Sequence, residues 1–583
     1  MYLVMLETNG NQRYIFSSPR LRESIGASFQ LTRLASWTKE ALGEPSVCHP
    51  TDPWVSRSSG KVIIMVDGES DAVSLIGRVT RRALAEAPGM DVSGVYVDMG
   101  GKKYVDAAAL KEVHTKAAEY ALSRPPALAR FSQMPFLTRA KDSVLPAAPP
   151  LGIRDEATDD TRTALSLPSR VKRHLALASR ESLLDRARIE GGLPDEELAR
   201  DPLKLERMLQ PLGDDDSLAL SKIAVIHIDG NGVGAIMRDL DMAMKKVPDG
   251  DFRKEKEVRC RPDDPDALRR FLLKVNERLE NSVIQAFVTA WRDVADWARQ
   301  DAEATGREHT AIPVVPVILG GDDVTVITSG DYALPFATAY LKDYEQRTEE
   351  DQLLSHLSDD PNGQSGPMTA AAGVAVVGHS YPFHIAYDLA ERLVTEAKKV
   401  GKASTPARST ISYHVLFDST VLDATQILHA YDSFTTRPFL LWPDDAPPAS
   451  AGESATSANG RSSWPEVCAR VRRFKNLTAE DSQATDARFP KTRAARIRRL
   501  LSDAAQAALA GDVARGRELQ DKAEAEWEDA RSNVDARIDT LLGDIKGLFD
   551  LMELTDILPA SYLDAIAPGE NTSATPSTSE DHA

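Results

Sequence analysis

The chain has 583 residues, of which 42% are hydrophobic and 27% are charged. This composition excludes a wholly disordered or fibrous protein, and the length predicts about four domains at roughly 150 residues each. Lys and Arg total 70 against 88 Asp and Glu, which gives a net charge of −18. That balance excludes a protein whose whole surface binds nucleic acid, so any such contact needs a local basic patch.

Three cysteines, Cys48, Cys260 and Cys468, lie too far apart to form a CxxC pair. Their spacing excludes a cysteine-based zinc finger and a disulfide framework, and it favours a reducing compartment. The first residues turn polar after residue 6 and are typical of a strand, not of a signal peptide. No stretch approaches 18 uninterrupted apolar residues. We therefore expect a cytoplasmic protein with no membrane partner.

The first part of the chain alternates predicted strands with predicted helices. The strands are expected at residues 2–7, 61–67 and 92–99, and the helices at residues 21–42 and 71–87. This rhythm indicates an α/β unit. Residues 66–70 contain acids at a place where a hairpin could lie, but they include only one glycine. We therefore predict no active-site motif in this part of the chain. A proline-rich stretch at residues 145–150 follows, and we place the first domain at residues 1–140.

The remainder of the chain is predicted to hold a second α/β domain between helical segments. Residues 141–220 are charged and form a helical linker, residues 221–425 form the second α/β domain, and residues 426–567 form a C-terminal helical domain. In the second α/β domain, strands are expected at 222–228, 314–319, 324–328 and 368–377, a helical insertion at 264–304, and an amphipathic helix at 386–399. Residues 444–463 and the tail 568–583 have the composition of disordered segments.

Two strands of the second domain end in acidic residues. One of them is followed by Gly320-Gly321-Asp322-Asp323 and then by a second apolar strand. This pattern is typical of a hairpin, and its glycines permit positive φ and the close approach of a ligand. Because adjacent side chains of an extended chain point to opposite faces, we expect at most one of the two aspartates to point squarely into a site. Asp229, at the end of another apolar strand, is the candidate second carboxylate.

The segment after Asp229 is rich in glycine. Gly230, Asn231, Gly232 and Gly234 leave backbone amides accessible at the start of a helix, where phosphate oxygens bind. A pair of carboxylates on neighbouring strands can hold Mg²⁺ ions that activate a hydroxyl and stabilise a leaving pyrophosphate.

Each of these signals also has an ordinary structural interpretation. A GGDD turn can be a plain hairpin with solvated acids, and glycines after a strand can be a Rossmann fingerprint, although no acidic strand end follows about 20 residues later. Lys398 and Lys399 can complement the dipole at a helix C-terminus, or reach a triphosphate. His227, inside an apolar strand, is interpreted as a core residue.

Several ordered blocks together resemble the large polymerase-like subunit of type III CRISPR effector complexes, the Csm/Cmr catalytic subunit. The blocks that carry the resemblance are residues 224–236, 317–327 with GGDD, 368–383, 386–399 and 409–416, and in the first unit residues 2–17 and 22–30. The resemblance implies an α/β fold of two ferredoxin-like, nucleotidyl-cyclase-like palms with helical domains. The first palm would be degenerate and the second catalytic.

The resemblance also implies a set of functional residues. Asp229, Asp322 and Asp323 would bind Mg²⁺ or Mn²⁺ and act in catalysis, while Gly320 and Gly321 would line the nucleotide and Lys398 and Lys399 would lie near its phosphates. Two ATP molecules would bind between the palms, and the 3′-hydroxyl of one would attack the α-phosphate of the other. The expected product is a cyclic oligoadenylate, and the expected partners are guide or target RNA and other effector subunits.

The chain departs from that family in three places. It contains no His-Asp dipeptide, so the family's HD nuclease domain is missing and no DNase activity is expected. The four-cysteine zinc site is missing as well. Ala370, Ala371 and Ala372 stand where many relatives carry a serine. The resemblance implies a nucleotide cyclase of antiviral defence, with a silent palm-fold scaffold or a cyclase outside a CRISPR complex as alternatives.

An arginine-rich stretch is the one basic concentration in the acidic chain. It comprises Arg470, Arg472, Arg473, Lys475, Arg493, Arg496, Arg498 and Arg499. A solvated helix face is the preferred interpretation and RNA contact the alternative.

Overall fold

The computed structural model describes most of the chain. The described residues are 1–18, 20–43, 52–58, 60–124, 136–153, 156–176, 178, 222–254, 258–306, 314–358, 365–378, 381–416, 423–431, 434–443, 461–478, 491–532 and 545–566. Most of the predicted linker 141–220, the low-complexity loop at 444–460 and the tail 568–583 lie outside these residues. Among the described residues, no helix combines the length and the hydrophobicity needed to cross a bilayer.

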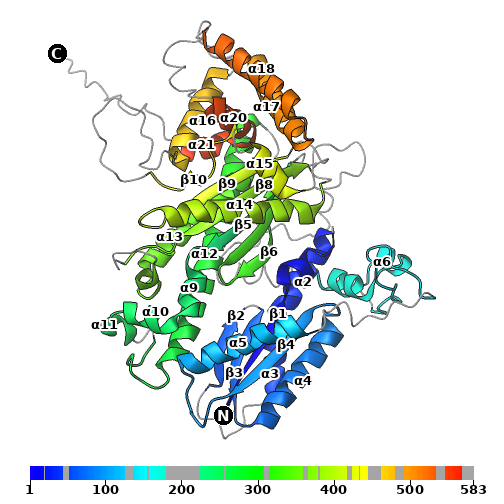
Figure 1. Cartoon of the computed structure of the whole chain (residues 1–583), viewed down its shortest axis with the longest axis vertical. Helices are drawn as coiled ribbons and strands as arrows, with labels where there is room; N and C mark the ends of the chain where they lie inside the picture. Colours follow the sequence, from blue (N-terminus) through cyan, green and yellow to red (C-terminus); the bar gives the residue numbers. More distant parts are fainter. Residues whose placement is uncertain are drawn as a thin grey trace, which may run out of the picture.

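The first unit, residues 1–124, is a four-stranded antiparallel sheet with helices on both faces (Figure 1). The strands are β1 (Tyr2–Asn9), β2 (Trp54–Ser58), β3 (Lys61–Val66) and β4 (Asp91–Asp98), in the order β2-β3-β1-β4. Its helices are α1 (Asn11–Ile15), α2 (Leu21–Thr32), α3 (Leu34–Leu42), α4 (Glu69–Glu86) and α5 (Ala107–Ser123). Helices α2 to α4 pack on one face and α5 packs on the other.

Two features of the first unit differ from the prediction. The single helix expected at 21–42 is divided at Arg33, whose N–H bonds to the carbonyl of Gln30 instead of continuing the α-helical pattern. The hairpin of this unit joins β2 to β3 near Gly60, which has a φ of +75°. Residues 66–70 instead lead from β3 into α4, so the acids there are not in a hairpin.

The second unit, residues 222–443, is a six-stranded mixed sheet in the order β10-β9-β8-β5-β7-β6. Its strands are β5 (Lys222–Gly230), β6 (Val314–Gly320), β7 (Asp323–Ser329), β8 (Ala370–Gly378), β9 (Thr410–Val415) and β10 (Phe439–Leu440). Its helices are α9 (Val233–Arg238), α10 (Leu240–Lys246), α11 (Asp249–Phe252), α12 (Ala267–Thr305), α13 (Ala333–Glu350), α14 (Phe383–Ala403) and α15 (Ala424–Tyr431), with 3-10 helices at Gly330–Tyr332 and Leu354–Leu357. Helices α12 and α13 cover one face, and α14 covers the other.

The strands that the sequence predicts in the second unit are present within one or two residues of the expected bounds. The insertion expected at 264–304 is the single helix α12 of 39 residues. The fold is therefore α/β with added helices, as predicted. Both hydrophobic cores run without a break from the first sheet into the second, because each contains residues of β1 and of β5.

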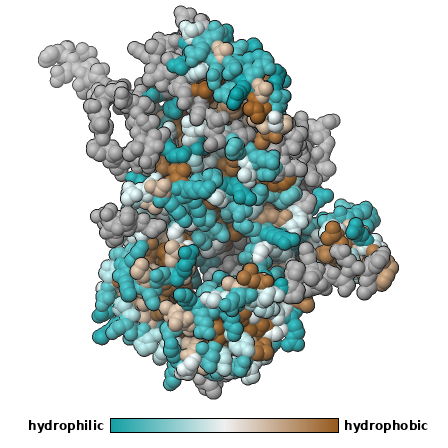
Figure 2. All heavy atoms as spheres, viewed as in Figure 1, coloured by the Kyte–Doolittle hydropathy of each residue, from teal (hydrophilic) through white to brown (hydrophobic). Residues whose placement is uncertain are grey.

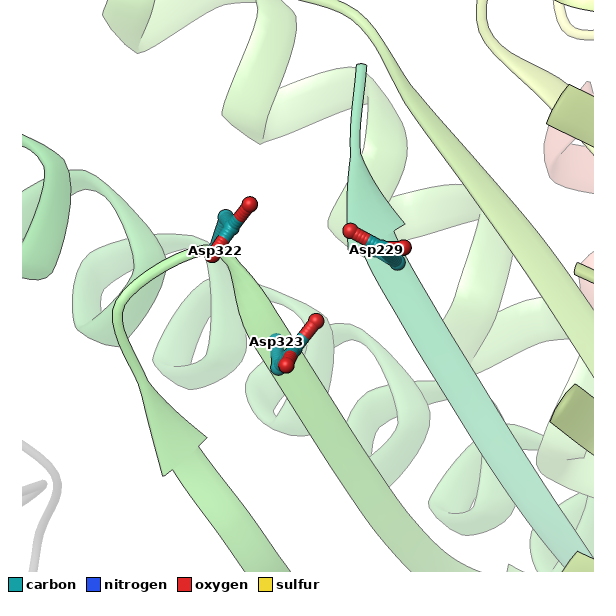
Figure 3. Close-up of side chains that lie close together, drawn as sticks. All are labelled: Asp229, Asp322 and Asp323. Atoms are coloured by element: carbon teal, nitrogen blue, oxygen red, sulfur yellow. The ribbon is translucent and has the colours of Figure 1, made fainter. Parts of the chain in front are cut away.

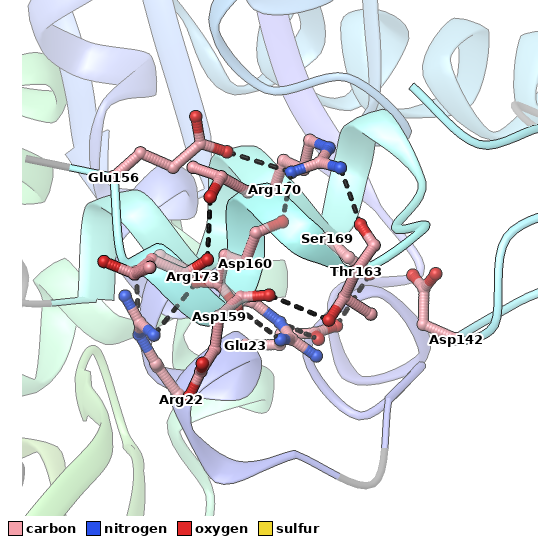
Figure 4. Close-up of polar contacts among 12 residues, drawn as sticks. Arg22, Glu23, Asp142, Glu156, Asp159, Asp160, Thr163, Ser169, Arg170 and Arg173 are labelled. Carbon is pink, nitrogen blue, oxygen red and sulfur yellow. Dashed lines mark hydrogen bonds and ion pairs between the residues drawn. The ribbon is translucent and has the colours of Figure 1, made fainter. Parts of the chain in front are cut away.

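A short segment after the first unit is bound to it by buried ion pairs (Figure 4). It includes α6 (Thr158–Arg162) and the helical residues 167–176. Arg173 lies 2.7 Å from the carboxylate of Glu23 on α2 and 2.7 Å from that of Asp160. Arg22 lies 3.1 Å from the second oxygen of Asp160. Since Glu23 and Asp160 are buried, these pairs hold the segment against α2.

The C-terminal region is a separate helical layer. Its helices are α16 (Trp464–Thr478), α17 (Lys491–Leu509), α18 (Val513–Ser532), α20 (Ile545–Ile557) and α21 (Ala560–Ile566). Helices α17, α18 and α20 share a core around Ile497 and Trp527. Helix α21 and most of the buried face of α16 pack into the core of the second sheet instead. Buried Arg437, just before β10, pairs with Asp550 at 2.8 Å and with Glu553, both on α20, which joins this layer to the second sheet. On the face shown in Figure 2, hydrophobic residues are scattered over a mostly hydrophilic surface.

Candidate metal centre and adjoining cavity

Strand pairing brings Asp229 next to the GGDD hairpin. Strand β5 is central in its sheet and pairs antiparallel with β7, in a register that places Asp229 opposite Asp323. Strands β6 and β7 form the predicted hairpin, and Gly321 at its tip has a φ of +68°, which only glycine adopts without strain. Two acids that are 94 positions apart in the sequence (229 and 323) therefore lie at one edge of the sheet.

All three predicted acids meet at this edge (Figure 3). Asp229, Asp322 and Asp323 each offer one carboxylate oxygen, and these oxygens lie within 4.8 Å of one another. The expectation that only one acid of the Asp322-Asp323 pair would point into the site is wrong. Side-chain alternation applies within a strand, and Asp322 lies in the turn before β7 begins.

The electrostatics of the cluster indicate a place for a cation. Burial raises the pKa of Asp323 to about 8, with Asp322 and Asp229 adding to the shift. Burial and the charge of Asp229 also raise the pKa of Asp322. Carboxylates brought this close repel one another and stabilise a bound cation. Lys398, on α14, supplies one positive charge through an ion pair with Asp229.

The residues around the acids fit a hard divalent ion. The donors are carboxylate oxygens, which Mg²⁺ and Mn²⁺ prefer. The Tyr344 hydroxyl lies near the cluster, and it is buried with no hydrogen-bond partner among the described residues. The Asn231 Oδ1, two residues after Asp229, is likewise buried and has no such partner. The Tyr344 oxygen lies 3.8 Å from the position that a Cβ on Gly230 would occupy. Buried polar atoms of this kind are normally satisfied, so a bound ion with its waters would account for them.

The glycine-rich segment after β5 packs tightly under the hairpin. The N–H of Gly230 donates to the Asp322 carbonyl at 3.2 Å, and a Cβ at Gly230 would lie 3.1 Å from the Asp322 Cβ. Asn231 is held by its Nδ2, which donates to the Thr369 hydroxyl at 2.9 Å. Gly232 has a φ of +82° and precedes α9. Gly320 ends β6, and Gly234 is the second residue of α9.

The two predicted lysines differ in position. Lys398 reaches the acid cluster. Lys399 pairs with Glu396 at 2.8 Å and its side chain is 66% exposed, so it points away from the acids. Consecutive residues of a helix are about 100° apart, which is why only one of the two can face the site. His227 is buried and bonds to the Thr325 hydroxyl at 3.0 Å, in agreement with the core interpretation.

A cavity of about 820 Å³ opens beside the hairpin, between the two units. The second unit contributes Gly321 and Asp322 of the hairpin, with Val233 and Gly234 of α9. Helix α12 forms one side through residues such as Leu272 and Asn276. The first unit contributes Asp52, Ser56, Arg57, Ser58, Lys61, Ile63, Ala107, Leu110, Lys111, His114 and Thr115. A cavity of this size can accommodate a nucleotide.

Sequence reasoning missed the first-unit side of this cavity. Lys61, Lys111 and His114 belong to no motif and come from a strand and a helix that pack together only in the fold. Burial, followed by the charge of Lys61, lowers the pKa of His114. The signal that could have identified Lys61 is its place at the start of the second hairpin strand, which requires the hairpin to be located correctly.

The basic stretch near the C-terminus is largely engaged in ion pairs. Arg472 pairs with Asp564, Arg493 with Asp529, Arg496 with Glu526, Arg498 with Asp556 and Arg499 with Asp503. Neutralised charges of this kind fit the preferred interpretation, a solvated helix face, better than they fit an RNA-binding surface.

One family model matches the part of the chain that carries the candidate metal centre. Residues 222–405 match the family model described as Cas10/Cmr2, second palm domain. No curated protein matches the chain by sequence.

Solved structures give a weaker likeness. A Csm1–Csm4 cassette in complex with cA4 is 11% identical with a TM-score of 0.38, and one in complex with one ATP is 12% identical with a TM-score of 0.40; each alignment covers 83% of this chain and 63% of the solved chain. A cassette in complex with AMPPNP is 11% identical, with a TM-score of 0.40 and coverage of 94% and 69%. This chain thus spans less than two thirds of the first two, and a likeness of this size supports no functional argument.

The family model covers β5 to α14, the elements that carry all three acids and Lys398. Residues 222–405 are therefore similar to the second palm domain of the Cas10/Cmr2 family.

Proposed function

We propose that the chain is a nucleotidyltransferase that converts ATP into a cyclic oligoadenylate at the edge of its second palm. The observation that carries this proposal is the convergence of Asp229, Asp322 and Asp323 within 4.8 Å, in a Cas10/Cmr2 second palm domain and beside a cavity of nucleotide size. A purely architectural subunit gains nothing from carboxylates whose burial and mutual repulsion raise their pKa values.

In this proposal the chain's own residues position the reacting groups. Asp229, Asp322 and Asp323 hold Mg²⁺ or Mn²⁺, which when bound lowers the pKa of the attacking 3′-hydroxyl and neutralises charge on the α-phosphate and the leaving pyrophosphate. Gly230, Gly232 and Gly234 let the backbone approach the phosphates closely, and Gly320 and Gly321 do the same at the hairpin. Lys398 places its ammonium beside Asp229, where it would neutralise charge on a bound phosphate. Lys399 has no part in it.

The cellular setting is part of the same proposal. We propose that this chain works in type III CRISPR defence with partner subunits and is activated by RNA, because residues 222–405 match a Cas10/Cmr2 second palm domain.

The test is product formation by the purified chain. The protein is incubated with each nucleoside triphosphate and Mg²⁺ or Mn²⁺, with and without RNA, and the products are resolved by mass spectrometry. We expect Asp323→Asn to lower ATP conversion by at least about 100-fold while the far-UV spectrum stays native. The matched control is Asp331→Asn, another aspartate with a raised pKa, which lies outside the cluster. Equal turnover by both variants would exclude the three acids as the catalytic site. If the parent protein forms no product in the presence of its RNA, the alternative of a catalytically silent palm-fold scaffold is favoured.

A further inference from the structure

The first unit places an aromatic ring against helix α14 of the second unit. Phe16, the residue after α1, stacks on Tyr387 of α14, with the ring centroids 3.7 Å apart and the ring planes 20° apart. Phe383, one turn earlier on α14, has its ring centroid 6.0 Å from that of Phe16. Tyr387 is buried, and Phe16 packs against the hydrophobic core to which both α14 residues belong. The first unit therefore supplies part of the packing around α14.

Tyr387 connects this stack to the strands that carry the acids. Its ring meets the His227 ring edge to face, with the centroids 5.4 Å apart. His227 lies two residues before Asp229 on β5, and side chains two residues apart on a strand point to the same face. The His227 Nδ1 is 3.0 Å from the hydroxyl of Thr325, which lies opposite it on β7, two residues after Asp323. His227 and Thr325 therefore form a second row of side chains directly behind the two acids.

The Tyr387 side chain is close enough to the acids to be affected by their charge. Burial raises the pKa of its hydroxyl, and the charges of Glu391, Asp323 and Asp229 raise it further. The ring is contacted from two directions, by Phe16 and by His227. A closely packed interior leaves few alternative positions for a side chain, so this stack fixes the second row. Removal of the Phe16 ring would open space beside Tyr387 and allow the second row to shift.

A lysine from the segment after the first unit fixes the residues around Phe16. Lys172 is buried, and its Nζ donates to the Tyr14 carbonyl at 2.8 Å and to the Ser17 hydroxyl at 3.0 Å. The same ammonium lies 3.9 Å from the centroid of the Tyr14 ring. Tyr14 and Ser17 lie on either side of Phe16 in the chain, so these bonds hold the backbone that carries its ring.

The position of Lys172 is itself set by close packing on α2. A Cβ at Gly26 of α2 would lie 1.9 Å from the Lys172 carbonyl oxygen, so the two backbones touch at this point. The ion pairs drawn in Figure 4 hold the same segment against α2. A continuous set of contacts thus leads from this segment through Lys172, Phe16 and Tyr387 to the second row and the acids.

We propose that Phe16 is a positioning residue of the acid cluster, and that Lys172 holds it in place. This inference rests on the proposed function, and it gives the first unit a part in the metal centre of the second through packing alone. Phe16 is not among the residues that line the cavity, so it should affect the geometry of the acids and not the binding of ATP. The docking of the segment that carries Lys172 would then set the activity of the acids.

The test is the affinity of the full chain for Mn²⁺ without nucleotide, measured by electron paramagnetic resonance, together with kcat and KM for product formation from ATP. Phe16→Leu keeps an apolar side chain but removes the stack, and it should lower both the Mn²⁺ affinity and kcat by about tenfold. KM for ATP should stay within about twofold of the parent value. Phe16→Tyr keeps the stack and should retain the Mn²⁺ affinity and kcat within about twofold. Lys172→Met, which acts one contact further away, should lower the Mn²⁺ affinity by about threefold.

The matched control is Phe29→Leu. Phe29 is a partly exposed ring on α2 of the same unit, next to Arg33, and it belongs to neither of the cores that join the two units. Its replacement should leave the Mn²⁺ affinity and kcat unchanged. A purely structural role of Phe16 would lower the thermal midpoint and leave the Mn²⁺ affinity of the folded protein at the parent value.

Four results would overturn the role of Phe16: no Mn²⁺ binding by the parent protein, an unchanged affinity in Phe16→Leu, an equal loss in Phe29→Leu, or a loss in Phe16→Tyr with a native thermal midpoint. An unchanged Mn²⁺ affinity in Lys172→Met would overturn the role of Lys172. Failure of the proposed function gives a different result, since the parent protein would then form no product with Mg²⁺ and RNA although its Mn²⁺ affinity still depends on Phe16.

Discussion

Gly373 in β8 offers a sharp test of how helix α14 brings Lys398 to the acids. A Cβ at this position would lie 2.3 Å from the Ala390 carbonyl oxygen and 2.8 Å from the Val394 nitrogen, both in the backbone of α14. Gly378, at the end of the same strand, would place its Cβ in open space, with no described atom within 4 Å. Gly373→Ala and Gly378→Ala are therefore a matched pair.

The geometry sets the size of the effect. A methyl group and a carbonyl oxygen need about 3.3 Å, so that α14 must move away from β8 by about 1 Å. Overpacking of this kind costs about 1–3 kcal/mol, and a clash with backbone atoms lies at the upper end. Replacing glycine with alanine also removes about 0.4–1 kcal/mol of unfolded-state entropy in both variants. We expect Gly373→Ala to be less stable than Gly378→Ala by about 2–3 kcal/mol.

Urea unfolding of the two variants measures this difference in stability. Product formation from ATP measures its effect on activity. Because Lys398 lies on the displaced helix, ATP conversion should fall in Gly373→Ala and stay at the parent level in Gly378→Ala. Equal stability of the two variants would refute the close packing of α14 on β8. A destabilised Gly373→Ala with full activity would refute the role of Lys398.

Three other outcomes follow from the described contacts. Tyr344→Phe removes a buried hydroxyl that has no described partner, so the metal-free protein should keep or gain thermal stability. The affinity for Mn²⁺, measured by electron paramagnetic resonance, should fall about tenfold. An unchanged affinity would contradict a link between this hydroxyl and the acids. Burial and the charge of Asp296 raise the pKa of Asp293 to about 6, so the native state binds more protons than the unfolded state between pH 4 and 6. The free energy of unfolding should therefore fall as the pH rises through this range, by at most about 1.4 kcal/mol per pH unit. Asp293→Asn should flatten this slope when it is measured by urea titration. Arg269→Met should lower the free energy of unfolding by about 2–4 kcal/mol, because Arg269 is buried and donates to Asp266 and to two carbonyls of the first unit. A decrease of less than about 0.5 kcal/mol would show that these hydrogen bonds are dispensable.

The main elements of the second unit could be predicted because its strands are continuous apolar runs with clear ends. The GGDD pattern identified a hairpin, and the end of strand β5 identified Asp229. The position of Asp322 could not be predicted from alternation, since it depends on where the turn gives way to the strand. Lys398 and Lys399 are equivalent in sequence, and only the rotation of α14 about its axis separates them.

The first unit was harder to predict. Strand β2 is short and polar, with the sequence WVSRS, and carries no clear alternation. The sequence therefore suggests a hairpin after β3, whereas the structure has it before β3. With the hairpin in the wrong place, the register that sets Glu7 opposite Lys61 was out of reach. The first-unit side of the cavity depends on that register and on the packing of α5.

Helix α12 has a consequence for dissecting the molecule. Its first turns lie along β2, the outermost strand of the first sheet, where Arg269 donates to the carbonyls of Asp52 and Trp54. Its last turn holds α21 through Asp301 and Ser561, at 2.7 Å. A fragment that ends after residue 124 would leave β2 uncovered, and an uncovered edge strand recruits other strands. The amino-terminal sheet should thus self-associate when expressed alone and remain dispersed when α12 is supplied.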